Sequence, residues 1–237
     1  MALIKVFCDF DGTITTKDLG DEIFRVFGCF EPWHTKLVEG EINITQYWKS
    51  ICETLKPGLT KAEIRDFALG CEIDAYFKQY AGFCAVSGIE LSIISDGYDA
   101  YIYPVLESLG LGNLKVFCNK LVFSGSMPPR PVFPLASESC RCMCASCKRN
   151  ALLMDTPDEA VIVYIGDGYS DFCAAGHSDI VFAKKNLAAH CNKYRIPHYP
   201  FANFFDVYKI MKEIVAKGKI KQRHQAALNR KRAIEGE

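Results

Sequence analysis

Three short, mostly apolar runs limit the folds open to this chain. They are LIKVFCDF at Leu3–Phe10, IELSIIS at Ile89–Ser95 and AVIVYI at Ala160–Ile165. Runs of this length and composition are typical of strands in a parallel sheet whose two faces are both covered. A shorter run at Ile180–Ala183 fits a fourth strand. Helical patterns separate the runs, so we predict an α/β fold with a Rossmann-like parallel sheet.

The first and second strands are separated by a long helical region. Helical patterns occur near residues 18–27, 44–55, 60–69 and 74–87, and Thr60 with Glu63 forms a capping-box signature. We therefore predict a helical cap at residues 14–80, inserted into a catalytic core made of residues 1–13 and 81–237. Further along, we expect a helix at Tyr98–Leu109, a strand at Leu114–Phe123 that could belong to a hairpin, and a loop rich in proline and cysteine at Ser124–Cys147.

Composition excludes several classes of protein. Of the 237 residues, 49% are hydrophobic and 24% are charged, which argues against disorder. Basic and acidic residues number 28 each, so no overall charge favours nucleic acid as a partner. No apolar run approaches the roughly 18 residues of a membrane span. The chain enters a strand-like run without an apolar signal region, and we expect a cytoplasmic protein, with monomer and homodimer both left open.

The C-terminal segment is basic. Lys217–Arg232 holds seven Lys or Arg residues and no acidic residue. We interpret it as a solvated helix end or a frayed terminus, with contact to an anionic partner as the alternative.

Polar residues follow each of the three main strands. Asp9 and Asp11 stand at the end of the first, and Asp167 and Asp171 follow the third. The second ends in Ser95-Asp96-Gly97, where a hydroxyl and backbone N–H groups are suited to holding an oxyanion. Each segment alone is also compatible with an ordinary turn or helix cap. Because ligands of open parallel sheets bind beyond the carboxyl ends of strands, we expect these residues to share one crevice.

Four acidic residues in one crevice require a compensating charge. Their carboxylates would repel one another unless a hard cation neutralised them, and oxygen ligands are what Mg²⁺ prefers. Lys148 opens a helical segment between the second and third strand ends. Most lysines at such places lie on the surface, but this one could instead balance the charge of a bound phosphate.

The order and spacing of these motifs resemble those of the haloacid dehalogenase superfamily. The resemblance spans Asp9 to Asp171, and the helical insertion after the first motif is similar to the C1-capped branch that contains phosphoserine phosphatase. It implies a phosphoric monoester hydrolase that acts through an aspartyl-phosphate on a small soluble phosphorylated metabolite.

The resemblance also implies a role for each motif residue. Asp9 is the nucleophile, and Asp11 protonates the leaving alcohol and then deprotonates the attacking water. Mg²⁺ is held by Asp9, the backbone carbonyl of Asp11 and Asp167, while Asp171 acts through water or orients Lys148. The implied phosphate-binding residues are Thr13, Ser95, Asp96, Gly97 and Lys148.

The residues in and around the motifs resemble those of a narrower group of phosphatases. DFDGTIT, ISDGYDAYI, CKR and GDGYSD are similar to 2-hydroxy-3-keto-5-methylthiopentenyl-1-phosphate phosphatases and phosphocholine/phosphoethanolamine phosphatases. Two features depart from phosphoserine phosphatase: Asp18 replaces a glutamate that contacts the substrate amine, and Ser95-Asp96-Gly97 replaces Ser-Gly-Gly. Phosphoserine, phosphocholine and phosphoethanolamine remain alternative substrates. A phosphotransferase or phosphomutase, or a silent binding module on the same fold, are alternative functions.

A cluster of cysteines directly precedes Lys148. It consists of Cys140, Cys142, Cys144 and Cys147. The spacing differs from the separated C-x-x-C pairs of structural zinc sites. Loop packing, metal binding and a redox-active pair are all left open. In the redox case, Cys147 is the favoured reactive thiol because Lys148 and Arg149 lie beside it.

Overall fold

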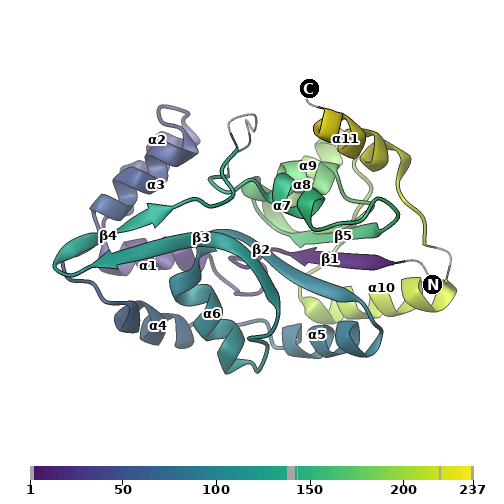
Figure 1. Cartoon of the computed structure of the whole chain (residues 1–237), viewed down its shortest axis with the longest axis horizontal. Helices are drawn as coiled ribbons and strands as arrows, with labels where there is room; N and C mark the ends of the chain where they lie inside the picture. The colour runs from purple at the N-terminus through teal and green to yellow at the C-terminus, as the bar shows by residue number, and fades with distance from the viewer. Residues whose placement is uncertain (1–2, 138–141, 143, 219, 236–237) are drawn as a thin grey trace.

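A seven-stranded sheet forms the centre of the molecule (Figure 1). The computed structural model describes residues 3–137, 142, 144–218 and 220–235. The strand order is β4-β3-β2-β1-β5-β6-β7, and every neighbouring pair is parallel except β3 and β4. The predicted α/β fold with a parallel sheet is therefore confirmed. The strands are β1 (Ile4–Cys8), β2 (Glu90–Tyr98), β3 (Lys115–Ser124), β4 (Met127–Val132), β5 (Val161–Gly166), β6 (Ile180–Ala183) and β7 (Tyr199–Pro200).

Helices cover both faces of the sheet. Figure 1 shows α7, α8 and α9 above the strands and α5, α6 and α10 below them. Side chains of β1 alternate between the two layers: Val6 and Cys8 pack in one apolar core, and Phe7 packs in the other. These six helices are α5 (Phe77–Val86), α6 (Asp99–Ser108), α7 (Lys148–Met154), α8 (Phe172–Gly176), α9 (Lys185–Tyr194) and α10 (Phe204–Lys217), with a short 3-10 turn at Tyr169–Asp171.

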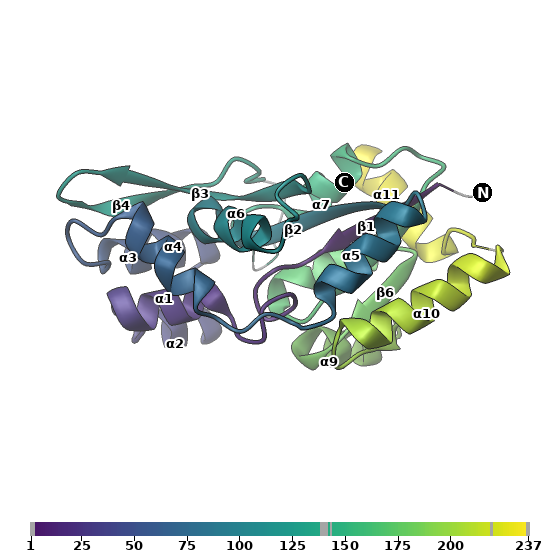
Figure 2. The same ribbon diagram turned by 90° about the horizontal axis from the view of Figure 1, so that it is seen from below.

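Four helices between β1 and β2 lie together at one end of the molecule (Figures 1 and 2). They are α1 (Leu19–Phe27), α2 (Trp33–Val38), α3 (Ile44–Glu53) and α4 (Lys61–Leu69). The capping box predicted at Thr60 and Glu63 is confirmed at the start of α4. Helix α5 lies instead beside α10 under the sheet (Figure 2). The predicted end of the cap at residue 80 thus falls inside α5, and the division into cap and core stays a prediction.

One predicted segment differs from the structure. The predicted loop at Ser124–Cys147 contains β4, which forms an antiparallel hairpin with β3. For the basic C-terminal segment, the structure agrees with a solvated helix and not with a frayed terminus, because the segment contains α11 (His224–Glu235), most of whose residues are exposed or half-buried. The guanidinium of Arg223 donates to the backbone oxygens of Ala175, Gly176 and Ser178. None of the described helices is both long and apolar enough to cross a membrane.

Candidate active site

The ends of three adjacent strands bring the predicted motifs together. Strand β1 lies between β2 and β5, so Asp9, Ser95 and Asp167 meet at the carboxyl edge of the sheet. Ser95 Oγ lies 3.2 Å from Asp11 Oδ2, and Thr13 Oγ1 lies 3.3 Å from Asp167 Oδ1. The topology therefore produces the shared crevice expected for an open parallel sheet.

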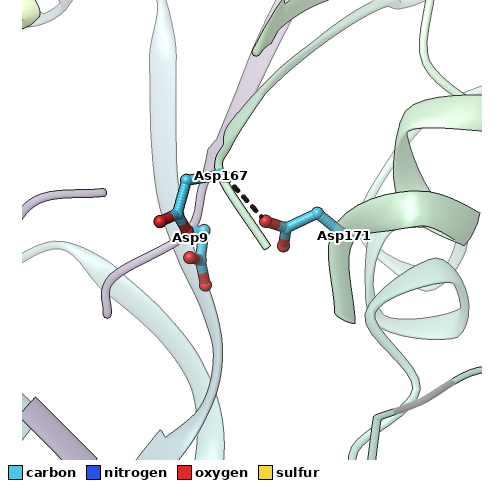
Figure 3. Close-up of side chains that lie close together, drawn as sticks. All are labelled: Asp9, Asp167 and Asp171. Carbon is cyan, nitrogen blue, oxygen red and sulfur yellow. Dashed lines mark hydrogen bonds between the residues drawn. The ribbon is translucent and has the colours of Figure 1, made fainter. Parts of the chain in front are cut away.

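Three carboxylates at this edge form a buried acidic cluster (Figure 3). One oxygen from each of Asp9, Asp167 and Asp171 lies within 4.8 Å of the others. Burial, together with the charge of Asp171, raises the pKa of Asp9 well above its usual range and also raises the pKa of Asp167. Hard carboxylate oxygens that repel one another at this distance fit a divalent cation of the Mg²⁺ class.

A glycine makes room for one of these carboxylates. Gly12 has a φ of 69°, and a Cβ there would lie 2.4 Å from Asp167 Oδ2. Both the positive φ and this close approach exclude other residues without local rearrangement. The Asp-Gly turn after β1 is therefore part of the site's construction.

Lys148 is the buried cation of the site. It is the first residue of α7, is only 2% exposed, and its Nζ lies 2.6 Å from both Asp9 Oδ1 and Asp171 Oδ1. Burial by itself would lower the pKa of Lys148, but the charges of Asp171 and Asp9 hold it well above its usual range. The lysine is thus charged and directed at Asp9, the predicted nucleophile.

Asp171 is held by several donors at once. Its Oδ1 accepts from Lys148 and from the Tyr164 hydroxyl at 2.6 Å each. Its Oδ2 accepts from the backbone N–H groups of Asp167 and Gly168, both at 2.9 Å. A carboxylate bound in this way is fixed in orientation, and it orients Lys148 directly.

Asp11 has two hydrogen-bonding partners at each carboxylate oxygen. The backbone N–H groups of Leu19 and Gly20 donate to Oδ1 at 3.2 and 3.4 Å. The hydroxyls of Tyr101 and Ser95 donate to Oδ2 at 2.8 and 3.2 Å. Burial, followed by the charge of Asp18, raises the pKa of Asp11 to about 7, although the two hydroxyls act in the opposite direction. This value suits a group that gives and takes a proton near neutral pH.

The Asp96 side chain binds the protein's own backbone and is not free to bind phosphate. We predicted a phosphate-binding residue, but the carboxylate accepts from the backbone N–H groups of Ala145 and Ser146 at 2.9 and 2.8 Å. The amide of Asn119 and the indole of Trp48 donate to the same carboxylate at 3.2 and 3.4 Å. A carboxylate with these partners, and with its own negative charge, holds the segment before α7 in place. At the same turn, the Gly97 N–H donates to Ser95 Oγ at 2.9 Å.

A cavity of about 540 Å³ opens over these side chains. Its floor is lined by four of the predicted site residues, Asp9, Asp11, Lys148 and Asp167. The opposite wall comes from the helices between β1 and β2. Its residues are Asp18, Asp21, His34, Leu37, Val38, Ile44, Tyr47 and Trp48.

Sequence reasoning missed three residues that contact the predicted site. Tyr101 contacts Asp11, Tyr164 contacts Asp171, and Lys185 Nζ lies 2.8 Å from Asp167 Oδ2. Lys185 follows β6, so the polar end of that fourth strand was an available signal. The two tyrosines lie within apolar segments and gave no such signal.

The cysteine cluster is only partly within the described residues. Cys140 lies outside them, whereas Cys144 and Cys147 are buried. Cys147 is the N-cap of α7, directly before Lys148. Loop packing, metal binding and redox activity all stay open for the cluster.

Comparison with known proteins identifies the family. Residues 6–176 match the family model of haloacid dehalogenase-like hydrolases. The chain belongs to this family and is a phosphoric monoester hydrolase.

Similar proteins cover nearly the whole chain. A 2-hydroxy-3-keto-5-methylthiopentenyl-1-phosphate phosphatase from Geobacillus thermodenitrificans is 33% identical over 212 residues, which are 86% of this chain and 93% of that protein. A protein of the same description from Brevibacillus brevis is 30% identical over 214 residues, covering 89% and 96%. A solved phospho-aspartyl intermediate analogue of phosphoserine phosphatase shares the fold, with a TM-score of 0.68 at 18% identity and coverage of 90% and 99%.

Proposed function

We propose that this phosphatase is a Mg²⁺-dependent phosphomonoesterase that hydrolyses a small phosphorylated metabolite through an aspartyl-phosphate on Asp9. The observation that carries the proposal is the pairing of two carboxylates with different surroundings at one cavity floor. Asp9 contacts the buried cation Lys148, whereas the hydrogen bonds that Asp11 accepts from the described residues come only from neutral donors, two hydroxyls and two backbone N–H groups. The first environment suits a nucleophile and the second an acid and base.

The reaction then runs in two displacements. An oxygen of Asp9 attacks the phosphorus while the bond to the ester oxygen breaks, and Asp11 gives its proton to that oxygen. Asp11, now a carboxylate, takes a proton from a water molecule that attacks the aspartyl-phosphate. Inorganic phosphate leaves, and both aspartates return to their first state.

The phosphoryl oxygens need positive partners throughout. We assign this role to Lys148, the hydroxyls of Thr13 and Ser95, and the backbone N–H groups beside Asp11, Asp96 and Gly97. Asp9, Asp167 and the backbone carbonyl of Asp11 would hold Mg²⁺, and Asp171 would fix Lys148 beside them. When bound, the metal ion supplies neutralisation of charge on the transferring phosphoryl group.

For the substrate, we propose first a methylthiopentenyl phosphate of the kind named for the similar bacterial phosphatases. The cavity supports this choice, because α2 and α3 supply an apolar wall. Leu37, Val38, Ile44 and Trp48 face the space above the catalytic floor. A thioether or another apolar substituent on the substrate would gain free energy by leaving water there.

A second class of substrate is favoured by two carboxylates on the same wall. Asp18 and Asp21 line the cavity, and burial, followed by the charge of Asp18, raises the pKa of Asp21 to about 8. The ammonium group of a substrate would offset the repulsion between the Asp18 and Asp21 carboxylates. Phosphoethanolamine, phosphocholine and phosphoserine carry such a group.

The test is phosphate release from a panel of phosphomonoesters. The panel holds the methylthiopentenyl ester, the three amine-bearing esters and several sugar phosphates, each with Mg²⁺ and with chelator. Asp9→Asn removes the nucleophile, and Asp66→Asn on the exposed side of α4 serves as the matched control. We expect turnover that needs metal, is lost in Asp9→Asn and persists in the control.

The outcomes distinguish the candidates. The ester with the highest kcat/KM selects between the apolar and the ammonium-bearing substrate. Transfer of labelled phosphate to a sugar would replace the hydrolase proposal by a phosphotransferase. No turnover of any ester by folded, metal-loaded protein would refute the proposal.

A further inference from the structure

A tyrosine to which the motifs assigned no role makes the shortest hydrogen bond to the proposed acid and base. Tyr101 lies on α6, one turn beyond the end of β2, and is 1% exposed. Its hydroxyl donates to Asp11 Oδ2 at 2.8 Å, compared with 3.2 Å for Ser95. The ring of Tyr101 is held by Phe10, whose ring centre lies 6.1 Å away. The hydroxyl thus approaches Asp11 from a fixed, buried ring.

Two glycines provide the space that this hydroxyl occupies. A Cβ on Gly97 would lie 1.9 Å from the Tyr101 hydroxyl and 2.5 Å from Asp11 Oδ2. A Cβ on Gly20 would lie 3.3 Å from the same hydroxyl. The backbone of β2 therefore approaches the phenol as closely as only glycine permits, and a side chain in the first turn of α1 would crowd it.

We propose that Tyr101 is a positioning residue for Asp11, which holds the carboxyl group in the orientation needed for proton transfer to the leaving oxygen. This inference rests on the proposed function and adds a residue to it. The phenol does not touch the reacting atoms, and it acts through the aspartate.

Hydrogen bonds hold both oxygens of the Asp11 carboxyl group. Oδ1 accepts from the backbone N–H groups of Leu19 and Gly20, and Oδ2 accepts from the two hydroxyls. When the phosphorus–oxygen bond breaks, the proton of Asp11 moves to the leaving oxygen, and the electron pair left on Asp11 is stabilised by these donors, of which the Tyr101 hydroxyl is the nearest.

Ser95 cannot do this work during the reaction. A serine hydroxyl has one proton to donate, and we have assigned Ser95 to the phosphoryl group. Once the substrate's phosphate group is bound, the Ser95 hydroxyl donates its proton to a phosphoryl oxygen and no longer to Asp11. Tyr101 is then the hydroxyl that remains on Asp11, because its ring is packed in the core.

The test measures kcat/KM for leaving groups of different basicity in Tyr101→Phe. This ratio covers the steps up to the first irreversible one, formation of the aspartyl-phosphate. p-Nitrophenolate leaves as a stable anion without protonation, whereas the alkoxide of β-glycerophosphate needs the proton of Asp11. We expect kcat/KM to fall by less than about twofold for p-nitrophenyl phosphate and by about tenfold or more for β-glycerophosphate. The second decrease is a part of the rate enhancement of about 10²–10⁴ that a general acid usually supplies.

Two variants calibrate the result. Tyr80→Phe removes another buried tyrosine hydroxyl, on α5 away from the cavity, and should leave both ratios unchanged. Asp11→Asn removes the proposed acid altogether. The difference between its losses of kcat/KM for the two esters is therefore the largest that Tyr101→Phe could show. Thermal unfolding of Tyr101→Phe shows that the comparison is made on folded protein.

The outcomes separate this inference from the proposed function. If the wild type hydrolyses neither of these two esters nor any other ester of the panel, the proposed function fails. If the wild type hydrolyses both and Tyr101→Phe lowers both by the same factor, or neither, Tyr101 has no role through Asp11 and the inference is overturned.

Discussion

Removal of the Asp96 carboxylate should destabilise the segment that leads into Lys148. Asp96→Ala deprives two backbone N–H groups of their acceptor, those of Ala145 and Ser146. Both residues are buried, at 5% and 2% exposure, so water cannot readily replace the lost partner. The Asn119 side chain loses one of its two bonds to Asp96 but keeps the other, to the backbone oxygen.

The size of the effect follows from these contacts. A buried donor left without a partner costs about 1–3 kcal/mol. Two buried backbone donors therefore give a loss of about 2–6 kcal/mol in the free energy of unfolding. For a chain of this size, each kcal/mol lowers the melting temperature by about 2–4 °C, so we expect a decrease of roughly 4–24 °C.

Chemical denaturation with urea, combined with a thermal melt, measures this loss. Asp99→Ala is the matched control, because the Asp99 carboxylate accepts from one backbone N–H, that of Leu121, at 3.0 Å. The control loses the acceptor of one donor instead of two, so it should lose about half as much, roughly 1–3 kcal/mol. Asp96→Asn keeps an acceptor oxygen and should lie between the wild type and Asp96→Ala. The reasoning is refuted if Asp96→Ala stays within about 0.5 kcal/mol of the wild type, the range of ordinary surface substitutions, or loses no more than Asp99→Ala.

Three further outcomes follow from the same structure. Lys148→Met leaves two buried carboxylates, Asp9 and Asp171, without their cationic partner. We therefore expect a loss of about 3–5 kcal/mol in stability and a decrease of about a hundredfold or more in the rate of phosphate release. An unchanged melting temperature would contradict this. Chelator should abolish phosphate release and Mg²⁺ restore it, and Mg²⁺ should raise the melting temperature of the wild type but not of Asp167→Asn. Hydrogen bonds from Lys56 and Thr60 lower the pKa of Glu63 to about 2. The stability that Glu63 adds over Glu63→Gln should therefore be full above its unfolded pKa of about 4.3 and be lost as the pH falls toward 2; urea unfolding at several pH values measures this difference, and a difference independent of pH would contradict it.

The motif residues could be predicted because their signals are local in the sequence. Strands buried on both faces must be apolar almost throughout, so the first polar residues after each run mark the strand ends. Asp9, Asp11, Asp167 and Asp171 all follow such runs. The parallel topology then brings them together without any further information about side chains.

The remaining parts depend on tertiary contacts. Tyr101 and Tyr164 contact the carboxylates only because of the way that α6 and β5 are packed. A tyrosine within an apolar segment of sequence cannot be distinguished from one that only fills the core. Asp96 could be placed at the strand end, but the two backbone N–H groups that donate to it come from a loop about fifty residues later. Strand β4 was missed because its sequence, MPPRPV, has the composition of a loop.

That unusual composition has a consequence for how the protein behaves at high concentration. Strand β4 is one outer strand of the sheet, and three of its residues are proline, which has no N–H to offer a strand from another molecule. The other outer strand, β7, is only two residues long and also ends in proline. Neither side of the sheet presents a long row of donors, so strand-by-strand aggregation of the folded protein is disfavoured at both sides.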